Sequence, residues 1–285
     1  MTVQMSSRRK VNNVANVQEK SSLLKKDGQD SCFQQRHGET VDGILGGRLK
    51  VIQKAKGYRF SVDAYLLSHF VYLKKNDRVL DMGTGSGVVA MLVAERGQCA
   101  EVVGVDVQEE MVDMARRSVF LNDLEHMIEI RRGDVREIET LFDRQSFDVV
   151  VLNPPYRKMQ AGRMNPDIQK SVARHETRGS LADFIAASAY VLKGSGHVFI
   201  IYPAARMVEL MFQMRSASIE PKRLKMVYSR GGLRGEFVLV EGIKGGGEEL
   251  EILPPLFIYK EDGTYSDEME RLFRELSACQ SAFCE

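Results

Sequence analysis

Four consecutive residues, Asn153 to Tyr156, have side chains suited to chemistry and follow directly on an apolar run. The run 149–152 reads Val-Val-Val-Leu and predicts a buried strand. Pro154 and Pro155 lack the amide hydrogen that a strand ladder needs, so the strand must end near Asn153. One interpretation is a plain turn, because proline pairs are common in turns. The other is an asparagine held at the carboxyl end of a strand, where open α/β sheets bind ligands.

A glycine-rich loop, DMGTGSG at residues 81–87, lies between another expected strand and the helix that follows it. Gly83, Gly85 and Gly87 allow the backbone to turn tightly and to approach a ligand closely. Asp81 precedes them, where its carboxylate can anchor an ammonium group or order the turn. The spacing is not the dinucleotide-binding G-x-G-x-x-G, so a purely structural turn stays open.

Two more acids follow neighbouring strands. Asp106 ends the strand after the glycine loop, where a carboxylate can hydrogen-bond to ribose hydroxyls or cap the next helix. Asp134, in RRGDV, follows the strand after that and can accept a hydrogen bond from an adenine amino group or form a turn. The glycine loop and Asp106 together favour nucleoside binding over a structural role.

The elements that must position these residues alternate regularly. From Arg78 onward, strands and amphipathic helices follow one another, which predicts an α/β fold with a parallel sheet and right-handed crossovers. The segments 223–229 and 236–243 have no helix between them and predict an antiparallel pair. A strand is expected at 49–52 and another from Tyr58 and Phe60, followed by a helix that Ser61 caps. We expect a polar, flexible extension at 1–40, the main domain at 41–265, and a C-terminal helix and tail at 266–285.

Composition limits the protein class. The 285 residues are 44% hydrophobic and 28% charged, with a net charge of +1, which fits a folded protein and excludes a polycation. No apolar run approaches the ~20 residues of a membrane span, and no signal peptide is evident. The four cysteines are scattered, so we expect neither a disulfide framework nor a metal site. A cytoplasmic protein is therefore predicted, and its oligomeric state, monomer or homodimer, stays open.

The combination of VLDMGTGSG, VVGVDV and NPPY in this order resembles class I S-adenosylmethionine-dependent methyltransferases, over roughly residues 45–260. The resemblance implies a Rossmann-like fold. Its seven-stranded, mostly parallel sheet has the order 3-2-1-4-5-7-6 with strand 7 antiparallel, and helices lie on both faces. It implies S-adenosyl-L-methionine as the cofactor. The residues implied to bind it are Phe60, Asp81, Gly83, Gly85, Gly87, Asp106, Val107, Asp134, Val135 and Asn153.

The NPPY segment resembles the catalytic tetrapeptide of amino-methyltransferases. By that resemblance the Asn153 side-chain oxygen and the Pro154 carbonyl accept hydrogen bonds from the target NH₂, which directs its lone pair at the methyl group. Pro155 stiffens the loop, and Tyr156 can stack on a planar base. No metal or covalent nucleophile is needed for in-line methyl transfer.

Two segments that flank these motifs indicate a narrower substrate class. YRFSVDAYLLSHFV at 58–71 and the C-terminal stretch around YSDEMERLF are similar to the bacterial tRNA1(Val) (adenine-37-N6)-methyltransferase family. This resemblance implies an anticodon-loop adenine of tRNA as the target, with Asp63 helping to close the pocket. Alternatives are a glutamine N5-methyltransferase of release factors, an rRNA guanine N2-methyltransferase, and an RNA-binding protein without turnover.

Two basic segments could contact RNA. In 157–178 basic residues outnumber acidic ones by six to two, and in 206–234 by seven to two. Charge runs are often just solvated faces, but the first run follows NPPY directly, so phosphate contacts near the site are plausible.

Overall fold

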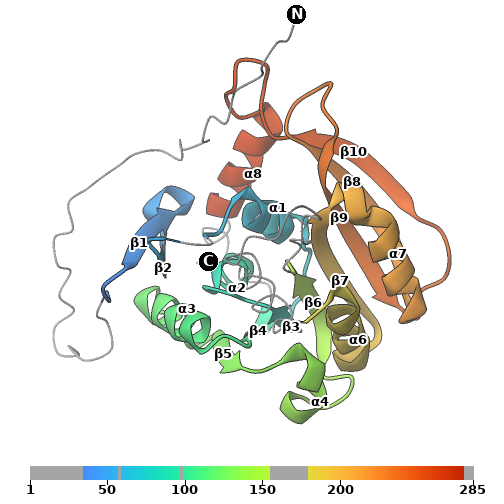
Figure 1. Ribbon diagram of the computed structural model, residues 1–285, viewed down its shortest axis with the longest axis horizontal. Coiled ribbons are helices and arrows are strands. Elements are labelled where there is room, and N and C mark those ends of the chain that lie inside the picture. The colour runs from blue at the N-terminus through green and yellow to red at the C-terminus, as the bar shows by residue number, and fades with distance from the viewer. Residues whose placement is uncertain (1–34, 57–58, 97–98, 155–178, 279–285) are drawn as a thin grey trace, which may run out of the picture. The chain divides into compact units, whose positions relative to one another are not determined.

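The computed structural model describes residues 35–56, 59–96, 99–154 and 179–278. An eight-stranded sheet lies at the centre of this part of the chain (Figure 1). From one edge to the other its strands are β10 (Glu251–Phe257), β8 (Ile219–Tyr228), β9 (Gly235–Lys244), β7 (Leu192–Pro203), β6 (Phe147–Leu152), β3 (Asp77–Met82), β4 (Cys99–Asp106) and β5 (Ile128–Arg132).

Only β9 among these strands is antiparallel to its neighbours. In chain order this is the predicted 3-2-1-4-5-7-6 arrangement with strand 7 reversed, so the predicted fold class is confirmed. The difference is β10, an eighth strand that pairs in parallel with β8 at the edge. Pro254 and Pro255 lie in this edge strand, where a missing amide hydrogen is tolerated.

Helices cover both faces of the sheet, because alternate residues of each strand point to opposite sides. In β6, Val149 and Val151 belong to one buried cluster, whereas Val150 and Leu152 belong to the other. The first face carries α1 (Val62–Phe70), α2 (Val88–Ala94), α3 (Glu109–Leu121) and α8 (Asp267–Ala278). The second carries η2 (Val135–Glu137), α4 (Ile138–Leu141), α6 (Leu181–Val191) and α7 (Met207–Ser216). The short helix η3 (Ala204–Arg206) leads into α7.

An antiparallel hairpin precedes this sheet. Its strands are β1 (Glu39–Ile44) and β2 (Leu49–Lys54), joined by η1 (Leu45–Gly47). The predicted strand at 49–52 is thus confirmed, but β1 was not anticipated from its mixed polar sequence. The hairpin is fixed to α3 by polar contacts. Ser118 Oγ accepts the Ile52 amide hydrogen at 2.9 Å, and the Asn122 amide bonds both the N–H and the C=O of Lys50, at 2.8 and 2.7 Å.

Arg117 makes the strongest of these connections. Its guanidinium donates to Glu39 of β1 and to Asp113 of α3, and its side chain is only 9% exposed. The hydrogen bond from Arg117 holds the pKa of the Glu39 carboxyl below its ordinary value. Such charge-assisted pairs are stronger than neutral hydrogen bonds, so the hairpin is anchored at its open end.

One local expectation was wrong. Phe60 does not start a strand. It lies just before α1, and its amide donates to the Gln53 side-chain oxygen at 2.9 Å, which replaces a ladder hydrogen bond; Tyr58 lies outside the described residues. Gly194 and Gly196 lie inside β7, which begins directly after α6 ends at Val191.

Among the helices of the described residues, none combines the length and the apolar character needed to cross a membrane.

Replacing Arg117 with Gln should lower the free energy of unfolding by about 2 kcal/mol, because Glu39 would lose its charged partner in a partly buried position. Urea denaturation at neutral pH measures this. Arg36→Gln is the matched control, since Arg36 pairs with the same Asp113 but is 60% exposed, and a loss below about 1 kcal/mol is expected. Equal losses in both variants would contradict the anchoring role of Arg117.

Candidate active site

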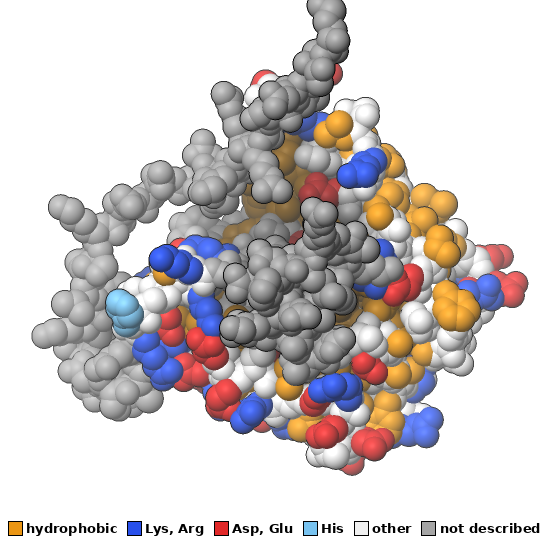
Figure 2. Space-filling model, viewed as in Figure 1, with side chains coloured by type: hydrophobic (Ala, Val, Ile, Leu, Met, Phe, Trp, Pro, Cys, Tyr) orange, Lys and Arg blue, Asp and Glu red, His pale blue; other side chains and the backbone are white. Residues whose placement is uncertain are grey.

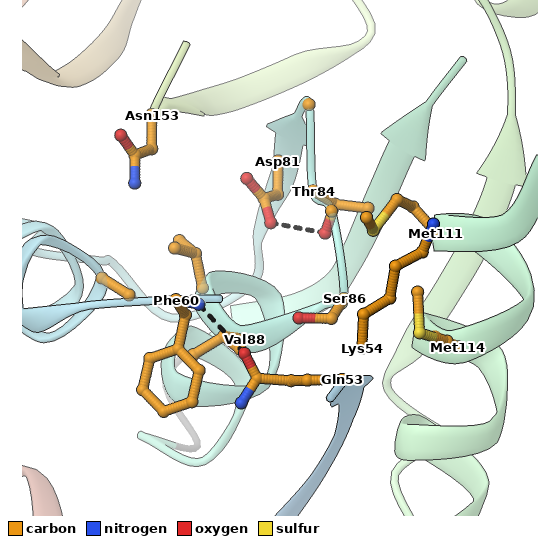
Figure 3. A pocket seen from close by; sticks show the side chains of 14 residues that line it. Gln53, Lys54, Phe60, Asp81, Thr84, Ser86, Val88, Met111, Met114 and Asn153 are labelled. Carbon is orange, nitrogen blue, oxygen red and sulfur yellow. Dashed lines mark hydrogen bonds between the residues drawn. The ribbon is translucent and has the colours of Figure 1, made fainter. Parts of the chain in front are cut away.

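A pocket lies where β3 and β6 end. Five of the residues predicted from the sequence line it, namely Phe60, Asp81, Gly83, Gly85 and Asn153. Figure 3 shows Asn153 and Phe60 on one side of this pocket and Lys54, Met111 and Met114 on the other, with Asp81 and Thr84 between them. The structure therefore brings these five predicted residues together around one pocket.

The glycine loop forms the floor of the pocket. The amides of Gly83 and Thr84 donate to the Val105 carbonyl, at 2.8 and 3.0 Å, which folds the loop over the end of β4. Gly85 has φ +57°, and a Cβ placed there would meet none of the described atoms within 4 Å. A side chain would therefore occupy pocket space, and only glycine combines this backbone angle with an open approach for a ligand.

Asp106 is tied to this loop. Its Oδ2 accepts the Gly85 amide hydrogen at 3.0 Å, and its Oδ1 accepts that of Gln108 at 2.9 Å. Asp106 thus orders the turn before α3 and faces the glycine loop, but the N-cap residue of α3 is Gln108. A carboxylate oxygen has two acceptor positions, so Oδ2 can still take a ribose hydroxyl, whereas Oδ1 also accepts from Gln108 Nε2 at 3.3 Å. Asp106 itself does not line the pocket.

Asp81 is a buried acid, 2% exposed, at the end of β3. Thr84 Oγ1 donates to its Oδ2 at 2.6 Å. Burial raises the pKa of the Asp81 carboxyl to about 7, and the hydrogen bonds from Thr84 and from the Ala90 amide offset only part of this effect. A cation placed in the pocket would therefore find an acid whose ionised form lacks a charged partner among the described residues.

Asn153 is held by a residue of α1. Its Nδ2 donates to Asp63 Oδ2 at 3.0 Å. Its Oδ1 is buried and has no hydrogen-bond partner among the described residues. Buried polar atoms are usually satisfied, so an orphaned acceptor in a pocket marks a place where a ligand donor would bind.

The hairpin contributes pocket residues that sequence reasoning missed. Gln53 and Lys54, at the end of β2, line the pocket, as do Met111 and Met114 of α3. Gln53 is 3% exposed, and its amide bridges the Phe60 N–H and the Asp42 carboxylate, at 2.9 and 2.7 Å. A glutamine within the apolar run LKVIQK was the one signal in the sequence; the methionines gave none, because their helical spacing is that of core residues.

The other predicted residues lie outside the pocket lining. Gly87 is the N-cap of α2 with φ +81°, and a Cβ there would come within 3.3 Å of Ala115. Val107 is half-buried after β4, and Val135 packs in the second core cluster. Asp134 caps η2 and pairs with Arg136, whose hydrogen bond lowers the pKa of that carboxyl.

Of the predicted catalytic tetrapeptide, Asn153 and a buried Pro154 are described. Pro155 and Tyr156 lie outside the described residues, as does the basic segment 157–178.

Most basic side chains of 206–234 are engaged within the protein. Arg206, Arg215, Arg223 and Lys225 pair with Glu209, Glu220, Glu241 and Glu268, and Lys222 donates to backbone carbonyls. The face in Figure 2 accordingly shows Lys and Arg interspersed with Asp and Glu on its described part. Arg230 and Arg234 lie in the exposed turn between β8 and β9 and are not engaged in this way. Neither makes an ion pair with a described residue, although Arg230 lies near enough to Asp262 to help lower its pKa.

The parallel sheet, the glycine loop and the acids at the strand ends define an α/β methyltransferase. The methyltransferase small domain family matches residues 62–216, more than half of the chain, and the protein belongs to that family.

Curated relatives agree with this assignment. A tRNA1(Val) (adenine(37)-N6)-methyltransferase of Porphyromonas gingivalis is 29% identical over 198 residues, 68% of this chain and 76% of the relative. An enzyme of the same name from Aeromonas salmonicida is 28% identical over 210 residues, 73% of this chain and 86% of the relative.

Solved structures share the fold. A predicted O-methyltransferase of Agrobacterium tumefaciens superposes with a TM-score of 0.61 at 24% identity, covering 74% of this chain and 95% of the other. The TYW2 protein of Pyrococcus horikoshii, solved in complex with MeSAdo, superposes with a TM-score of 0.53 at 15% identity, covering 73% and 72% of the two chains.

Asp81 should make stability depend on pH. In the folded protein its carboxyl keeps a proton up to a pH of about 7, whereas the unfolded chain releases it around its ordinary pKa of 3.8. Unfolding between these values releases a proton, so the free energy of unfolding falls as the pH rises. Asp81→Asn removes this fall, which we expect to amount to ~2–4 kcal/mol. Urea denaturation at about pH 4.5 and at about pH 8 measures the free energy of unfolding near the two ends of this fall. An unchanged pH dependence in the variant would contradict the buried, protonated acid.

Proposed function

We propose that this protein transfers the methyl group of S-adenosylmethionine to N6 of an adenine in tRNA, at position 37 of tRNA1(Val). The observation that carries the proposal is the buried, unpartnered Oδ1 of Asn153 in a pocket beside the glycine loop. The names of the curated relatives support the substrate.

The residues of the pocket fit this cofactor. A ligand with an ammonium group would provide the cation that the buried Asp81 carboxylate lacks among the described residues. The open space over Gly85 would let the backbone approach a nucleoside, and Asp106, which accepts the Gly85 amide hydrogen, would take a ribose hydroxyl. When bound, the cofactor supplies a methyl group on a positively charged sulfur, which an amine lone pair can attack in line.

Asn153 would supply what the target amine lacks. The lone pair of an adenine amino group is delocalised into the ring, so the nitrogen is a poor nucleophile. A hydrogen bond from the amine to Asn153 Oδ1 would hold the nitrogen in place and stabilise the positive charge that develops on it during transfer. Proton loss to solvent then follows methylation, and no covalent intermediate with the protein is required.

The substrate is tested with unmodified tRNA1(Val) transcripts. We expect transfer of labelled methyl groups to the natural sequence and none to a transcript with guanine at position 37, with N6-methyladenosine as the labelled nucleoside. Label in the guanine transcript would contradict position 37 as the site of methylation. A labelled nucleoside other than N6-methyladenosine would contradict the proposed N6-methylation of adenine.

Asn153→Ala should separate chemistry from cofactor binding. We expect kcat to fall about 100- to 1,000-fold, the usual effect of removing one such hydrogen-bonding group. The dissociation constant of S-adenosylhomocysteine, measured by calorimetry, should change by less than about threefold, because the loop and acids that would hold it are intact. Unchanged turnover would remove Asn153 from the reaction.

The turn between β8 and β9 should contact RNA phosphates. β8 runs parallel to β6, so its carboxyl end lies at the same edge of the sheet as Asn153, about 14 Å away across three strand spacings. Replacing Arg230 and Arg234 with Ala should weaken tRNA binding and reduce the slope of log K against log salt by about one unit for each phosphate that is no longer neutralised. Arg215→Ala is the control, since Arg215 is already paired with Glu220. Equal slopes in both variants would contradict the assignment.

A further inference from the structure

We infer that Asp63 is the positioning residue that fixes the Asn153 amide with its oxygen available to the substrate amine. The inference rests on the proposed function, in which Asn153 Oδ1 is the acceptor. It assigns to α1, the first helix, a role in catalysis that acts entirely through Asn153.

The contact joins two distant parts of the chain. Asp63 is 1% exposed in the first turn of α1, and Asn153 follows β6. The distance from Asn153 Nδ2 to Asp63 Oδ2 is 3.0 Å. A carboxylate can only accept hydrogen bonds, so only the NH₂ branch of the asparagine amide can face it. The oxygen branch must then point away from Asp63, and this oxygen is the one without a partner among the described residues.

The carboxylate is itself held in place. Asp63 Oδ1 accepts from Ser61 Oγ at 2.7 Å and from the Ala64 amide at 3.0 Å. Ser61 is the predicted N-cap of α1, yet its hydroxyl makes no capping bond and bonds Asp63 instead. The start of the helix is thus arranged around the carboxylate, with Oδ1 turned to the helix and Oδ2 to Asn153.

The negative charge adds a second effect. A charged acceptor on the NH₂ branch polarises the amide, which makes Oδ1 a stronger acceptor because hydrogen bonds in a chain reinforce one another. Both effects act in the transition state, so removing them should lower kcat rather than cofactor affinity.

The decisive variant is Asp63→Asn, which keeps the size and changes the hydrogen bonding. The Ala64 amide still requires an acceptor, so the oxygen of the new amide stays on it, and its NH₂ branch replaces Oδ2. Because Oδ2 faces Asn153, that donor would be met by the oxygen of the Asn153 amide. The Asn153 amide would have to turn over and present NH₂ to the substrate amine, donor against donor. We expect kcat to fall about 100-fold or more.

The double variant Asp63→Asn with Asn153→Asp exchanges the two groups. The carboxylate at position 153 would accept from the new amide with one oxygen and present the other to the substrate. We expect it to recover at least about tenfold in kcat over Asp63→Asn alone, the non-additivity expected of two groups in direct contact. Asn153→Asp alone would set two carboxylates against each other and should be less active than the double variant.

The controls separate positioning from folding and from ligand binding. Asp148→Asn makes the same chemical change at the other end of β6, where Asp148 pairs with Lys193, and should keep turnover within about twofold. Thermal melting identifies any variant that fails to fold. The affinity for S-adenosylhomocysteine should stay within about threefold in Asp63→Asn. Near-normal turnover in Asp63→Asn, no recovery in the double variant, or a loss that falls on cofactor affinity would each overturn the inference.

A readout without substrate keeps this test apart from the proposed function. In ¹⁵N-labelled protein the Asn153 side-chain NH₂ signals, assigned by their loss in Asn153→Asp, should move strongly in Asp63→Asn and little in Asp148→Asn. Unmoved signals in Asp63→Asn would overturn the positioning contact even if tRNA is methylated. Shifted signals together with no transfer to any tRNA would leave the contact standing and overturn the proposed substrate.

Discussion

The parallel pairing of β3, β4 and β6 is the constraint on which the site depends. Because these strands run in one direction, the polar residues at their carboxyl ends meet at one edge of the sheet. Asp81, Asp106 and Asn153 lie far apart in the sequence and owe their proximity to this ladder alone. Two further elements then close the pocket on the same face, since α1 brings Asp63 to Asn153 and β2 brings Gln53 to Phe60.

The polar groups of this edge are poorly satisfied by the protein itself. Asp81 is buried with hydrogen bonds but without a cation among the described residues, and Asn153 Oδ1 has no described partner. Each of these costs stability, since buried polar groups lose hydration that only a partner can replace. The apolar clusters on the two sheet faces offset that cost. In the proposed function the ligands supply both missing groups, a cation at Asp81 and an NH donor at Asn153.

Much of the fold and part of the site could be predicted from the sequence. The parallel sheet followed from βαβ alternation, and its strand order came from the resemblance. Asp81, Gly83, Gly85 and Asn153 were found because glycine spacing and proline pairs leave a local signal. The hairpin strand β1 was missed because it is held by side chains of α3, a long-range contact with no local pattern. Gln53 and the Asp63–Asn153 contact were missed for the same reason. For Asp134 the sequence left adenine binding and a turn open, and the structure shows it capping η2 and paired with Arg136.

The most direct test of the account is transfer of labelled methyl groups from S-adenosylmethionine to total tRNA, ribosomal RNA and protein from a bacterial strain that lacks this gene. The proposed geometry predicts label in tRNA, recovered as N6-methyladenosine after nuclease digestion, and its loss with Asn153→Ala. Label confined to ribosomal RNA or to a release factor would keep the methyl-transfer chemistry and contradict the substrate. No label in any fraction, from a folded protein, would contradict the central claim that this edge of the sheet methylates an amine of tRNA.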